Sequence, residues 1–549
     1  MARVKIVLDM NSGFPKKTAL AVVTFIVLVM APEALPALKN YRSLDFARIA
    51  TLLDFPLPKP AVAPELAAES LVNQVSQRAM PATVAAGAPS SLPSSLPAPT
   101  PTQILPPANP KKLFDPSGEM NKFFAALDRG EGVHILHYGD SPTTADLITA
   151  DARLLFQKRF GDGGLGFTLV AKPWAWYNHR GIDMSASSDW IIDIGLQSLI
   201  RDGRNGLGAV SFRGRKGARA SWKLRDRNHS YVEVAYISET ADGEFTFDAD
   251  GKPIGMATTS GDPGTPPGTP GFARFEIPSG AREFGLRVTR GTVRLFGVDF
   301  RKNVPGVVYS SLGVNGANVT LLSKALDQKH WSAQLQHYRP ALVIINYGTN
   351  ESGFSDFVDT TWAGELRRVI ARVRSALPDT SILLMSPMDR GDKDGAGDIV
   401  TLAALPRLVS TEQRVAMEEH VAFFNTFEAM GGAGTMARWY AAEPRLVGSD
   451  FIHPMPAGAR IVGELLFAAI YGAFEQYKMQ DSQFSSESKV PLAGGPNTGV
   501  PAVAIPAVVS PVSPAGAANK DDSGKGEFAP QSADGIGGAK APVKEDPAH

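Results

Sequence analysis

Cysteine is absent from this chain of 549 residues, and neither sign of charge predominates. Without cysteine the chain can form no disulfide, no thiolate zinc site, no cysteine nucleophile and no lipid-modified cysteine anchor. The 55 Lys and Arg residues balance the 55 Asp and Glu residues. This balance argues against a polybasic nucleic-acid-binding protein. Hydrophobic residues make up 44% of the chain, enough to build a large core.

One uncharged apolar run, residues 18–32, lies near the N-terminus and follows four basic residues. The run is shorter than the roughly 20 residues of a transmembrane helix and is typical of a secretory signal. No Ala-x-Ala cleavage site follows it, so an uncleaved inner-membrane anchor remains the alternative. We therefore expect residues 1–38 to be a signal peptide or a membrane anchor. In either case the rest of the chain is extracytoplasmic, for example periplasmic.

Low-complexity segments flank the central part of the chain. Residues 56–110 contain 13 prolines among Ala, Ser and Thr. Such segments bury too little apolar surface to fold, and proline keeps them extended. We expect a disordered linker over residues 39–111 and a disordered tail over residues 479–549.

Apolar strands alternate with amphipathic helices over residues 112–179 and 305–478. This alternation predicts a parallel sheet with helices on both faces. The strands are expected at 133–139, 341–348 and 381–387, and the helices at 145–160, 321–337, 362–377, 411–430 and 457–477.

The alternation stops over residues 180–304. Short runs of period two, separated by Gly and Pro turns, occur there at 231–237, 273–277, 283–289 and 292–300. They predict an all-β insert, a sandwich or jelly roll, inside an α/β domain. The chain is therefore expected to be an α/β protein with 112–179 and 305–478 as the two parts of one domain.

The first of four polar segments is HYGDSPTTAD, residues 137–146. Ser141 follows a strand pattern and begins a helical one, which places it at the carboxyl edge of the sheet, where open α/β folds bind ligands. Its backbone N–H is free to donate to a negative charge at the helix N-terminus. An N-cap serine without chemistry would show the same pattern.

Two further segments combine glycines with an asparagine. SSLGVNGANV (310–319) is glycine-rich, and its glycines permit a close approach of the backbone to a ligand. INYGTNES (345–352) places Asn350 just after an apolar strand, where its amide could donate to an oxyanion. Taken separately, each segment is also compatible with an ordinary turn.

The fourth segment, SDFIHPMPAGAR (449–460), places Asp450 three residues before His453 at the start of a helix. An aspartate in this position can hold the Nδ1–H of the imidazole and leave Nε2 free to accept a serine proton. The alternative is an N-capping aspartate beside a surface histidine.

The order of these segments resembles the four signature blocks of the SGNH (GDSL-like) hydrolase superfamily. The resemblance covers the α/β part of the chain and implies a three-layer, flavodoxin-like fold. It also implies that Ser141 is the nucleophile, His453 the general base and Asp450 its orienting partner. The implied oxyanion donors are the N–H groups of Ser141 and Gly316 and the side chain of Asn350. Gly316, rather than Gly313, aligns with the glycine of the second block.

A closer resemblance is to the peptidoglycan O-acetylesterase type, which carries a carbohydrate-binding-module-like β domain at this place. It is carried by GDSPTTAD, by RFGDGGLGF (159–167), by the β insert and by YGTNES. It implies an exported serine esterase that hydrolyses O-acetyl or other short acyl esters of a cell-envelope polysaccharide, without a cofactor. Pro142 departs from the commoner pattern, which has His after the serine, and this leaves the substrate preference open.

Two alternatives to the esterase remain at this stage. An acetyltransferase would use the same triad and pass the acyl group to a sugar hydroxyl. A non-catalytic glycan-binding envelope protein would keep the fold without needing all four segments. Neither alternative requires a nucleic acid, and the oligomeric state cannot be predicted.

Several other residues are candidates for binding. Trp174 and Trp176 could stack on a sugar ring or fill the core. Residues 201–227 contain nine Arg or Lys residues, which could bind a polyanionic glycan but are better explained as solvated strand faces. His134 and His137 have no H-x-x-E or H-E-x-x-H companion, so no metal site is predicted.

Overall fold

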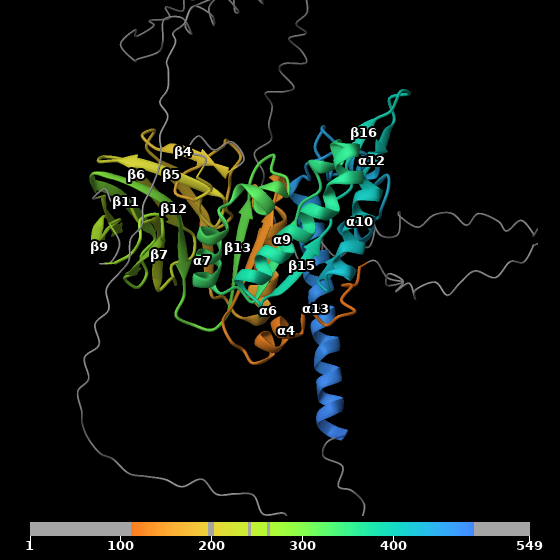
Figure 1. Ribbon diagram of the computed structural model, residues 1–549, viewed down its shortest axis with the longest axis horizontal. Helices are drawn as coiled ribbons and strands as arrows, with labels where there is room; N and C mark the ends of the chain where they lie inside the picture. The colour runs from red at the N-terminus through yellow and green to blue at the C-terminus, as the bar shows by residue number, and fades with distance from the viewer. Residues whose placement is uncertain (1–110, 196–201, 240–242, 261–263, 488–549) are drawn as a thin grey trace, which may run out of the picture. The chain divides into compact units, whose positions relative to one another are not determined.

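A computed structural model of the chain describes residues 111–487, except 196–201, 240–242 and 261–263. The predicted signal or anchor (1–38), the linker up to residue 110 and the tail beyond residue 487 lie outside the described residues. Within them the predicted fold class is confirmed, because a parallel sheet with helices on both faces is interrupted by antiparallel sheets (Figure 1).

The parallel sheet has five strands in the order β13-β1-β14-β15-β18. In chain order this is 2-1-3-4-5, the flavodoxin-like order, in which ligands bind at the carboxyl ends of the strands where the order reverses. The reversal lies at β1, which pairs with β13 on one side and β14 on the other. The strands are β1 (Val133–Gly139), β13 (Val307–Gly313), β14 (Leu342–Asn346), β15 (Ser381–Met385) and β18 (Ala422–Phe424).

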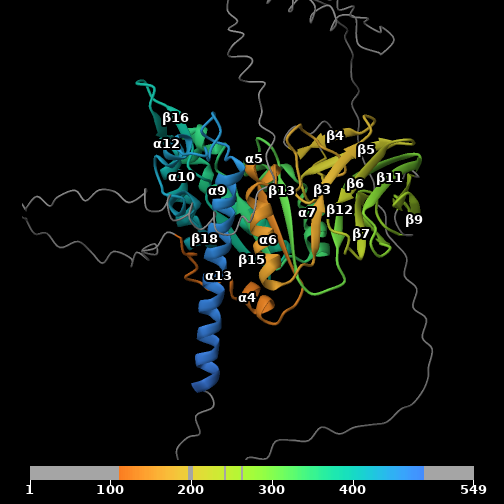
Figure 2. The same cartoon turned by 180° about the vertical axis from the view of Figure 1, so that it is seen from behind.

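Both faces of this sheet are buried, as the continuous apolar strands require. Ile135 of β1 belongs to one core cluster and Leu136 to the other, because neighbouring side chains of a strand point to opposite faces. The first cluster includes α4 (Asn121–Asp128), α6 (Ile148–Phe160) and α13 (Pro456–Glu487), which are seen from their side in Figure 2. The second includes α7 (Gln328–Tyr338), α9 (Trp362–Ala376) and α10 (Leu405–Glu418).

One predicted helix is wrong in extent. The sequence pattern predicts a single helix over 411–430, but α10 ends at Glu418 and the edge strand β18 follows. His420 has a φ of +53°, a left-handed conformation that ends the helix. The periodic apolar pattern runs through both elements and hides this break. The shorter elements of the α/β part are α5 (Ser141–Thr144), η3 (Leu321–Ala325), η4 (Glu351–Gly353), α8 (Ser355–Thr360), β16 (Gly391–Lys393), β17 (Ile399–Thr401), α11 (Thr426–Ala429) and α12 (Thr435–Ala441).

The β insert consists of two antiparallel sheets whose aromatic side chains meet in one core, for example Trp222 of one sheet and Phe300 of the other. One sheet has the order β10-β7-β12-β5-β4 and the other β3-β6-β11-β8-β9. Their strands are β3 (Ile182–Ala186), β4 (Ile191–Ile194), β5 (Val210–Arg215), β6 (Arg219–Leu224), β7 (Tyr231–Ile237), β8 (Glu244–Ala249), β9 (Lys252–Thr258), β10 (Pro270–Glu276), β11 (Glu283–Arg290) and β12 (Thr292–Arg301).

A strand before the insert also joins these sheets. β2 (Gly164–Thr168) pairs antiparallel with β12, although it precedes the expected boundary at residue 180. At the other end, α13 continues to Glu487, past the expected end of the domain at residue 478. The domain boundaries themselves stay a prediction.

Among the described helices, only α13 contains a segment, Pro456–Gln480, that is long and apolar enough to cross a membrane. Half of the apolar stretch in this segment is buried inside the structure. Val462, Leu466 and Ile470 lie in the core cluster that also contains Ile148 and Phe156 of α6. The apolar composition of α13 is thus accounted for by its place against the sheet.

Candidate active site

Ser141 lies at the carboxyl edge of the parallel sheet, at the first residue of α5. The preceding strand ends at Gly139, where a Cβ atom would lie only 2.3 Å from Oγ1 of Thr143. The glycine therefore allows the chain to turn tightly from strand into helix. The Ser141 side chain is mostly buried beside this turn.

His453 and Asp450 lie next to Ser141, although 312 positions separate Ser141 from His453. Nε2 of His453 is 2.7 Å from Oγ of Ser141, and Nδ1 is 2.6 Å from Oδ2 of Asp450. With the Nδ1–H donated to the carboxylate, Nε2 is the acceptor for the serine proton. The structure therefore brings together the three residues predicted as nucleophile, base and orienting partner.

The loop that carries Asp450 is held by its own hydrogen bonds. Oδ1 of Asp450 accepts the backbone N–H groups of Ile452 (3.0 Å) and His453 (3.1 Å). Burial acts to raise the pKa of Asp450, but the hydrogen bonds from the ring and backbone of His453 and from Ile452 hold it below its ordinary value. Asp450 consequently remains ionised and keeps its hold on the imidazole at neutral pH.

Gly316 and Asn350 lie on adjacent segments after β13 and β14. Nδ2 of Asn350 donates to the carbonyl of Ala317 at 2.7 Å, which ties it to the peptide that follows Gly316. Gly316 has a φ of +69°, and nothing lies within 4 Å of where its Cβ would be. Asn350 thus donates one amide hydrogen to Ala317, and its second amide hydrogen has no partner among the residues that the structure describes.

Glu351 was not predicted as a site residue, yet it joins these two segments. Oε1 accepts the N–H of Val319 at 2.7 Å, and Oε2 accepts the N–H of Gly348 at 3.0 Å. Burial, with a smaller contribution from Asp140, raises the pKa of Glu351 to about 7 against these hydrogen bonds. We call this arrangement the loop clamp. Its signal in the sequence was an acidic residue directly after the asparagine of GTNE.

Asp140 was also missed, although it precedes the predicted nucleophile. Burial raises its pKa to about 6, while the side chain of Thr349 and the charges of His453 and Arg390 oppose the shift. Arg390 itself donates to the carbonyl of Thr349 at 2.7 Å. Nothing in the sequence around Arg390 pointed to the site.

Glu412 of α10 is a fully buried carboxyl group near Glu351, and both of its oxygens lack a hydrogen-bond partner within the described residues. Burial, and secondarily the charge of Glu351, raises its pKa well above the ordinary 4.5. The folded protein therefore retains a proton that the unfolded chain releases above pH 4.5. Stability is lost as the pH rises, by about 1.4 kcal/mol per pH unit from this group until its folded pKa is passed.

We expect Glu412→Gln to be more stable than the unaltered protein at pH 8, because glutamine has a similar shape and no proton to lose. The difference should shrink toward pH 4, where the carboxyl group is protonated in both states. Thermal denaturation at both pH values measures the effect. If the Tm of Glu412→Gln changed with pH as the Tm of the unaltered protein does, Glu412 would not be the source of this pH dependence.

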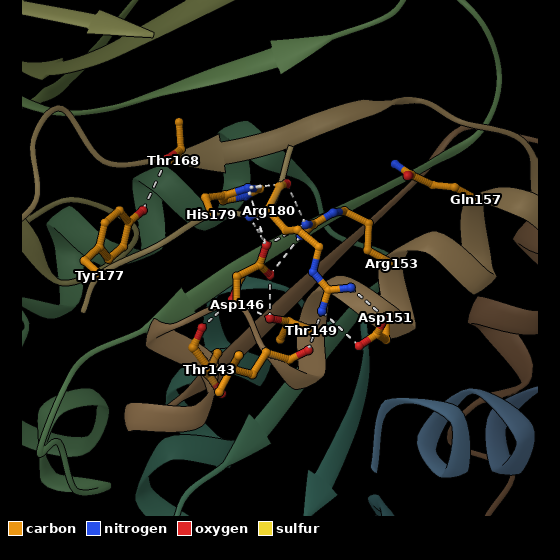
Figure 3. Close-up of polar contacts among 12 residues, drawn as sticks. Thr143, Asp146, Thr149, Asp151, Arg153, Gln157, Thr168, Tyr177, His179 and Arg180 are labelled. Carbon is orange, nitrogen blue, oxygen red and sulfur yellow. Dashed lines mark hydrogen bonds and ion pairs between the residues drawn. The ribbon is translucent and has the colours of Figure 1, made fainter. Parts of the chain in front are cut away.

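A buried charged network surrounds Asp146, two residues after the end of α5 (Figure 3). Asp146 has a φ of +50° and accepts hydrogen bonds from Thr149 (2.7 Å), from Arg153 (2.6 and 3.1 Å) and from the backbone of Arg180 (2.7 Å). Burial alone would raise the pKa of Asp146, but the charges of Arg153 and His179 lower it to about 2. Ser311 of β13 attaches α5 to the parallel sheet by donating to the carbonyl of Thr143 at 2.8 Å.

The two predicted tryptophans differ in environment. Trp176 is 59% exposed, and its Nε1–H donates to Oδ1 of Asn315 at 2.9 Å, directly beside Gly316. Trp174 is partly buried against the core and lies edge-on to Tyr177. Only Trp176 presents its ring to solvent next to the predicted oxyanion segment.

His134 and His137 lie on opposite faces of β1, since they are three residues apart in a strand. His134 is bonded to Ser310 (2.7 Å) and Arg301 (2.9 Å), and His137 to Tyr309 (2.7 Å). Within the described ranges no group of three or more His, Asp or Glu side chains could hold a metal ion.

A comparison with protein-family models matches one part of the chain. The model of the GDSL-like Lipase/Acylhydrolase family matches residues 279–461, a range that contains Gly316, Asn350, Asp450 and His453 and begins after Ser141. No curated protein sequence matches the chain.

Solved structures similar to this chain include two esterases, and the first of them has the same fold. One described as a peptidoglycan O-acetylesterase is 22% identical, with a TM-score of 0.53 over 66% of this chain and 99% of its own. A family two carbohydrate esterase from Clostridium thermocellum, solved with cellohexaose, is 15% identical, with a TM-score of 0.24 over 53% of this chain and 99% of its own.

Proposed function

Because this chain belongs to the SGNH (GDSL-like) hydrolase superfamily and is by class a carboxylic ester hydrolase, we propose that it removes O-acetyl or other short acyl groups from a cell-envelope polysaccharide such as peptidoglycan. The observation that carries this proposal is the row of contacts from Ser141 through His453 to Asp450. The similar structure described as a peptidoglycan O-acetylesterase supports the choice of polysaccharide.

In the proposed reaction, Oγ of Ser141 attacks the carbonyl carbon of the ester while Nε2 of His453 takes its proton. Asp450 holds the imidazole in the required tautomer and stabilises the imidazolium that forms. His453 then gives this proton to the oxygen of the departing sugar, which leaves as a free hydroxyl, and the acyl group remains on Ser141. A water molecule, deprotonated by His453, releases the acid and restores the serine.

The negative charge on the carbonyl oxygen would be stabilised by the N–H groups of Ser141 and Gly316 and by the second amide hydrogen of Asn350. We expect Asn350→Ala to lower kcat by roughly 10²–10³ with little change in KM, since the donor acts mainly in the transition state. Asn350→Asp, which keeps the shape and lacks the N–H groups, should lose at least as much. Near-normal rates in both folded variants would remove Asn350 from the proposed oxyanion hole.

The test of the proposed function is acetate release from O-acetylated peptidoglycan, acetylated xylan and small acetyl esters, with Ser141→Ala as the control. Free acetate from the polymer supports hydrolysis, whereas an acetylated acceptor would indicate the acetyltransferase alternative. Labelling of Ser141 by a fluorophosphonate separates either enzyme from a non-catalytic glycan-binding protein. Absence of both labelling and acetate release would overturn the proposal.

The remaining parts of the proposal follow from the substrate. A protein that acts on an envelope polysaccharide must leave the cytoplasm, which residues 1–38 would achieve as a signal peptide or an anchor. The exposed ring of Trp176 beside Asn315 would provide a surface for a sugar of the substrate. The insert over residues 180–304 would hold further sugars of the polymer, while Trp174 has a packing role in this scheme.

A further inference from the structure

Residues 389–391 lead from β15 into the hairpin of β16 and β17, and they contact two loops of the candidate active site. We call these residues the brace. One loop follows β14 and carries Asn350, and the other precedes α13 and carries His453. The two loops come from distant parts of the sequence. A third segment that contacts both can therefore fix the distance between them.

The side chain of Arg390 binds the loop that follows β14. Its Nη1 donates to the carbonyl of Thr349 at 2.7 Å and to Oγ of Ser352 at 3.3 Å. Oγ of Ser352 donates to the same carbonyl at 2.7 Å. A hydrogen bond from a charged donor is stronger than one between neutral groups. Arg390 thus holds the peptide group that joins Thr349 to Asn350.

The backbone of Gly391 binds the loop that precedes α13. Its N–H donates to the carbonyl of Phe451 at 2.9 Å. Phe451 follows Asp450 directly and has a φ of +57°, a conformation that a bulky residue keeps only where the surrounding structure holds it. A Cβ atom on Gly391 would lie 2.9 Å from Cβ of Phe451 and 3.0 Å from Cγ2 of Ile399. The glycine therefore allows a close approach that a larger residue would prevent.

Asp389 anchors the brace to elements outside both loops. Its side chain is buried, and Oδ1 accepts a hydrogen bond from Oγ1 of Thr401 at 2.8 Å. Oδ2 accepts the backbone N–H of Met436 in α12 at 2.9 Å. Thr401 also pairs with Gly391 across the hairpin of β16 and β17. The backbone of the brace is therefore held by β17 and α12, and it can serve as a fixed support for both loops.

We propose that the brace sets the distance between Asn350 and His453. Arg390 and Gly391 are accordingly positioning residues, one for the oxyanion donor and the other for the general base. The inference rests on the proposed acyl transfer at Ser141, in which the donor must reach the substrate oxygen while the base contacts Oγ. Both conditions depend on the spacing of the two loops, and a misplacement of about 1 Å costs about 10² in rate.

Arg390→Met, which keeps the length of the side chain and removes its donors, should lower kcat for 4-nitrophenyl acetate by about 10² with little change in KM. Arg390→Lys, which can still donate to Thr349, should recover part of this loss. Arg374→Met is the matched control, because Arg374 donates to a backbone carbonyl outside the brace, that of His420 at 3.1 Å. It should leave kcat unchanged. A higher KM with an unchanged kcat in Arg390→Met would indicate contact with the substrate and overturn the inference.

Combination of Arg390→Met with Asn350→Ala tests whether Arg390 acts through the oxyanion donor. The double variant should be little slower than Asn350→Ala alone, because a donor that has been removed can no longer be misplaced. If the two losses of kcat multiplied in the double variant, Arg390 would not act on the position of Asn350, and the inference would be overturned.

Gly391→Ala tests the contact with the loop that carries His453. The added Cβ would push against Phe451, and kcat should fall about tenfold or more. Gly395→Ala is the matched control, because Gly395 lies in the same hairpin and nothing lies within 4 Å of where its Cβ would be. Thermal denaturation verifies that each variant folds, and the Arg390 variants decide the matter if Gly391→Ala does not. Equal kcat in folded Gly391→Ala and Gly395→Ala would overturn the inference.

The rate at which a fluorophosphonate labels Ser141 is a readout that needs no polysaccharide. We expect labelling to be slower in Arg390→Met and Gly391→Ala, because it depends on the same base and oxyanion donors. Slower labelling without acetate release from any acetylated polymer would preserve the brace and contradict the proposed substrate. Labelling of both variants at the unaltered rate would overturn the inference.

Discussion

Ser141→Ala and His453→Ala should each lower kcat by roughly 10⁶, the largest effect expected of any substitution in this protein. The two side chains act as one unit, because Nε2 of His453 lies 2.7 Å from Oγ of Ser141 and takes its proton. Among the described residues, no other side chain forms a hydrogen bond with this oxygen. The double variant should therefore be no slower than either single variant. Steady-state hydrolysis of a small acetyl ester measures all three.

Asp450 gives this prediction a graded control. Asp450→Asn should cost roughly 10⁴, less than loss of the serine or histidine, because the base remains present with its tautomer no longer fixed. Each variant should unfold at nearly the same temperature as the unaltered protein. If the loss of kcat in the double variant equalled the product of the losses in Ser141→Ala and His453→Ala, the two residues would not share one proton transfer.

Glu351→Ala should lower kcat by about 10³, although we do not expect this carboxylate to touch the substrate. The loop clamp bonds Val319 on the segment after Gly316 and Gly348 on the segment before Asn350. Releasing both segments displaces two proposed oxyanion donors at once, and misplacement of about 1 Å costs about 10². Glu351 is thus a positioning residue, and kcat should fall more than KM rises.

The pH profile separates positioning from general stability. With a pKa raised by burial to about 7, Glu351 accepts both N–H groups fully only above that pH. Activity should therefore decline as the pH falls through about 7 and Glu351 becomes protonated. Glu351→Gln should already be impaired at high pH, and its activity should not show this decline. Glu412→Gln is the matched control, since it alters a neighbouring buried carboxyl group that makes none of these bonds. Equal losses of kcat in Glu351→Gln and Glu412→Gln would indicate a packing effect alone.

Local patterns in the sequence were sufficient for much of the fold. The alternation of apolar strands and amphipathic helices predicted the parallel sheet, and the period-two runs predicted β7 at its observed bounds. These predictions succeeded because burial on one or two faces imposes a repeat that can be read along the chain. The helix expected over 411–430 failed because the left-handed turn at His420 leaves the apolar pattern unbroken.

Four short segments in the right order were enough to name Ser141, Gly316, Asn350, Asp450 and His453 as candidates. The sequence could not supply the distances between them, since these depend on which strands become neighbours. Pairing of β1 with both β13 and β14 places the ends of three strands at one edge, and α13 begins close enough to bring His453 to Ser141.

The supporting residues were decided by tertiary structure alone. Glu351, Asp140 and Glu412 acquire their altered pKa values from burial among groups remote in sequence. Residue type and local order thus determined which chemistry this chain can carry. Desolvation and contacts between distant segments, which have no local signature, decided how that chemistry is held in place.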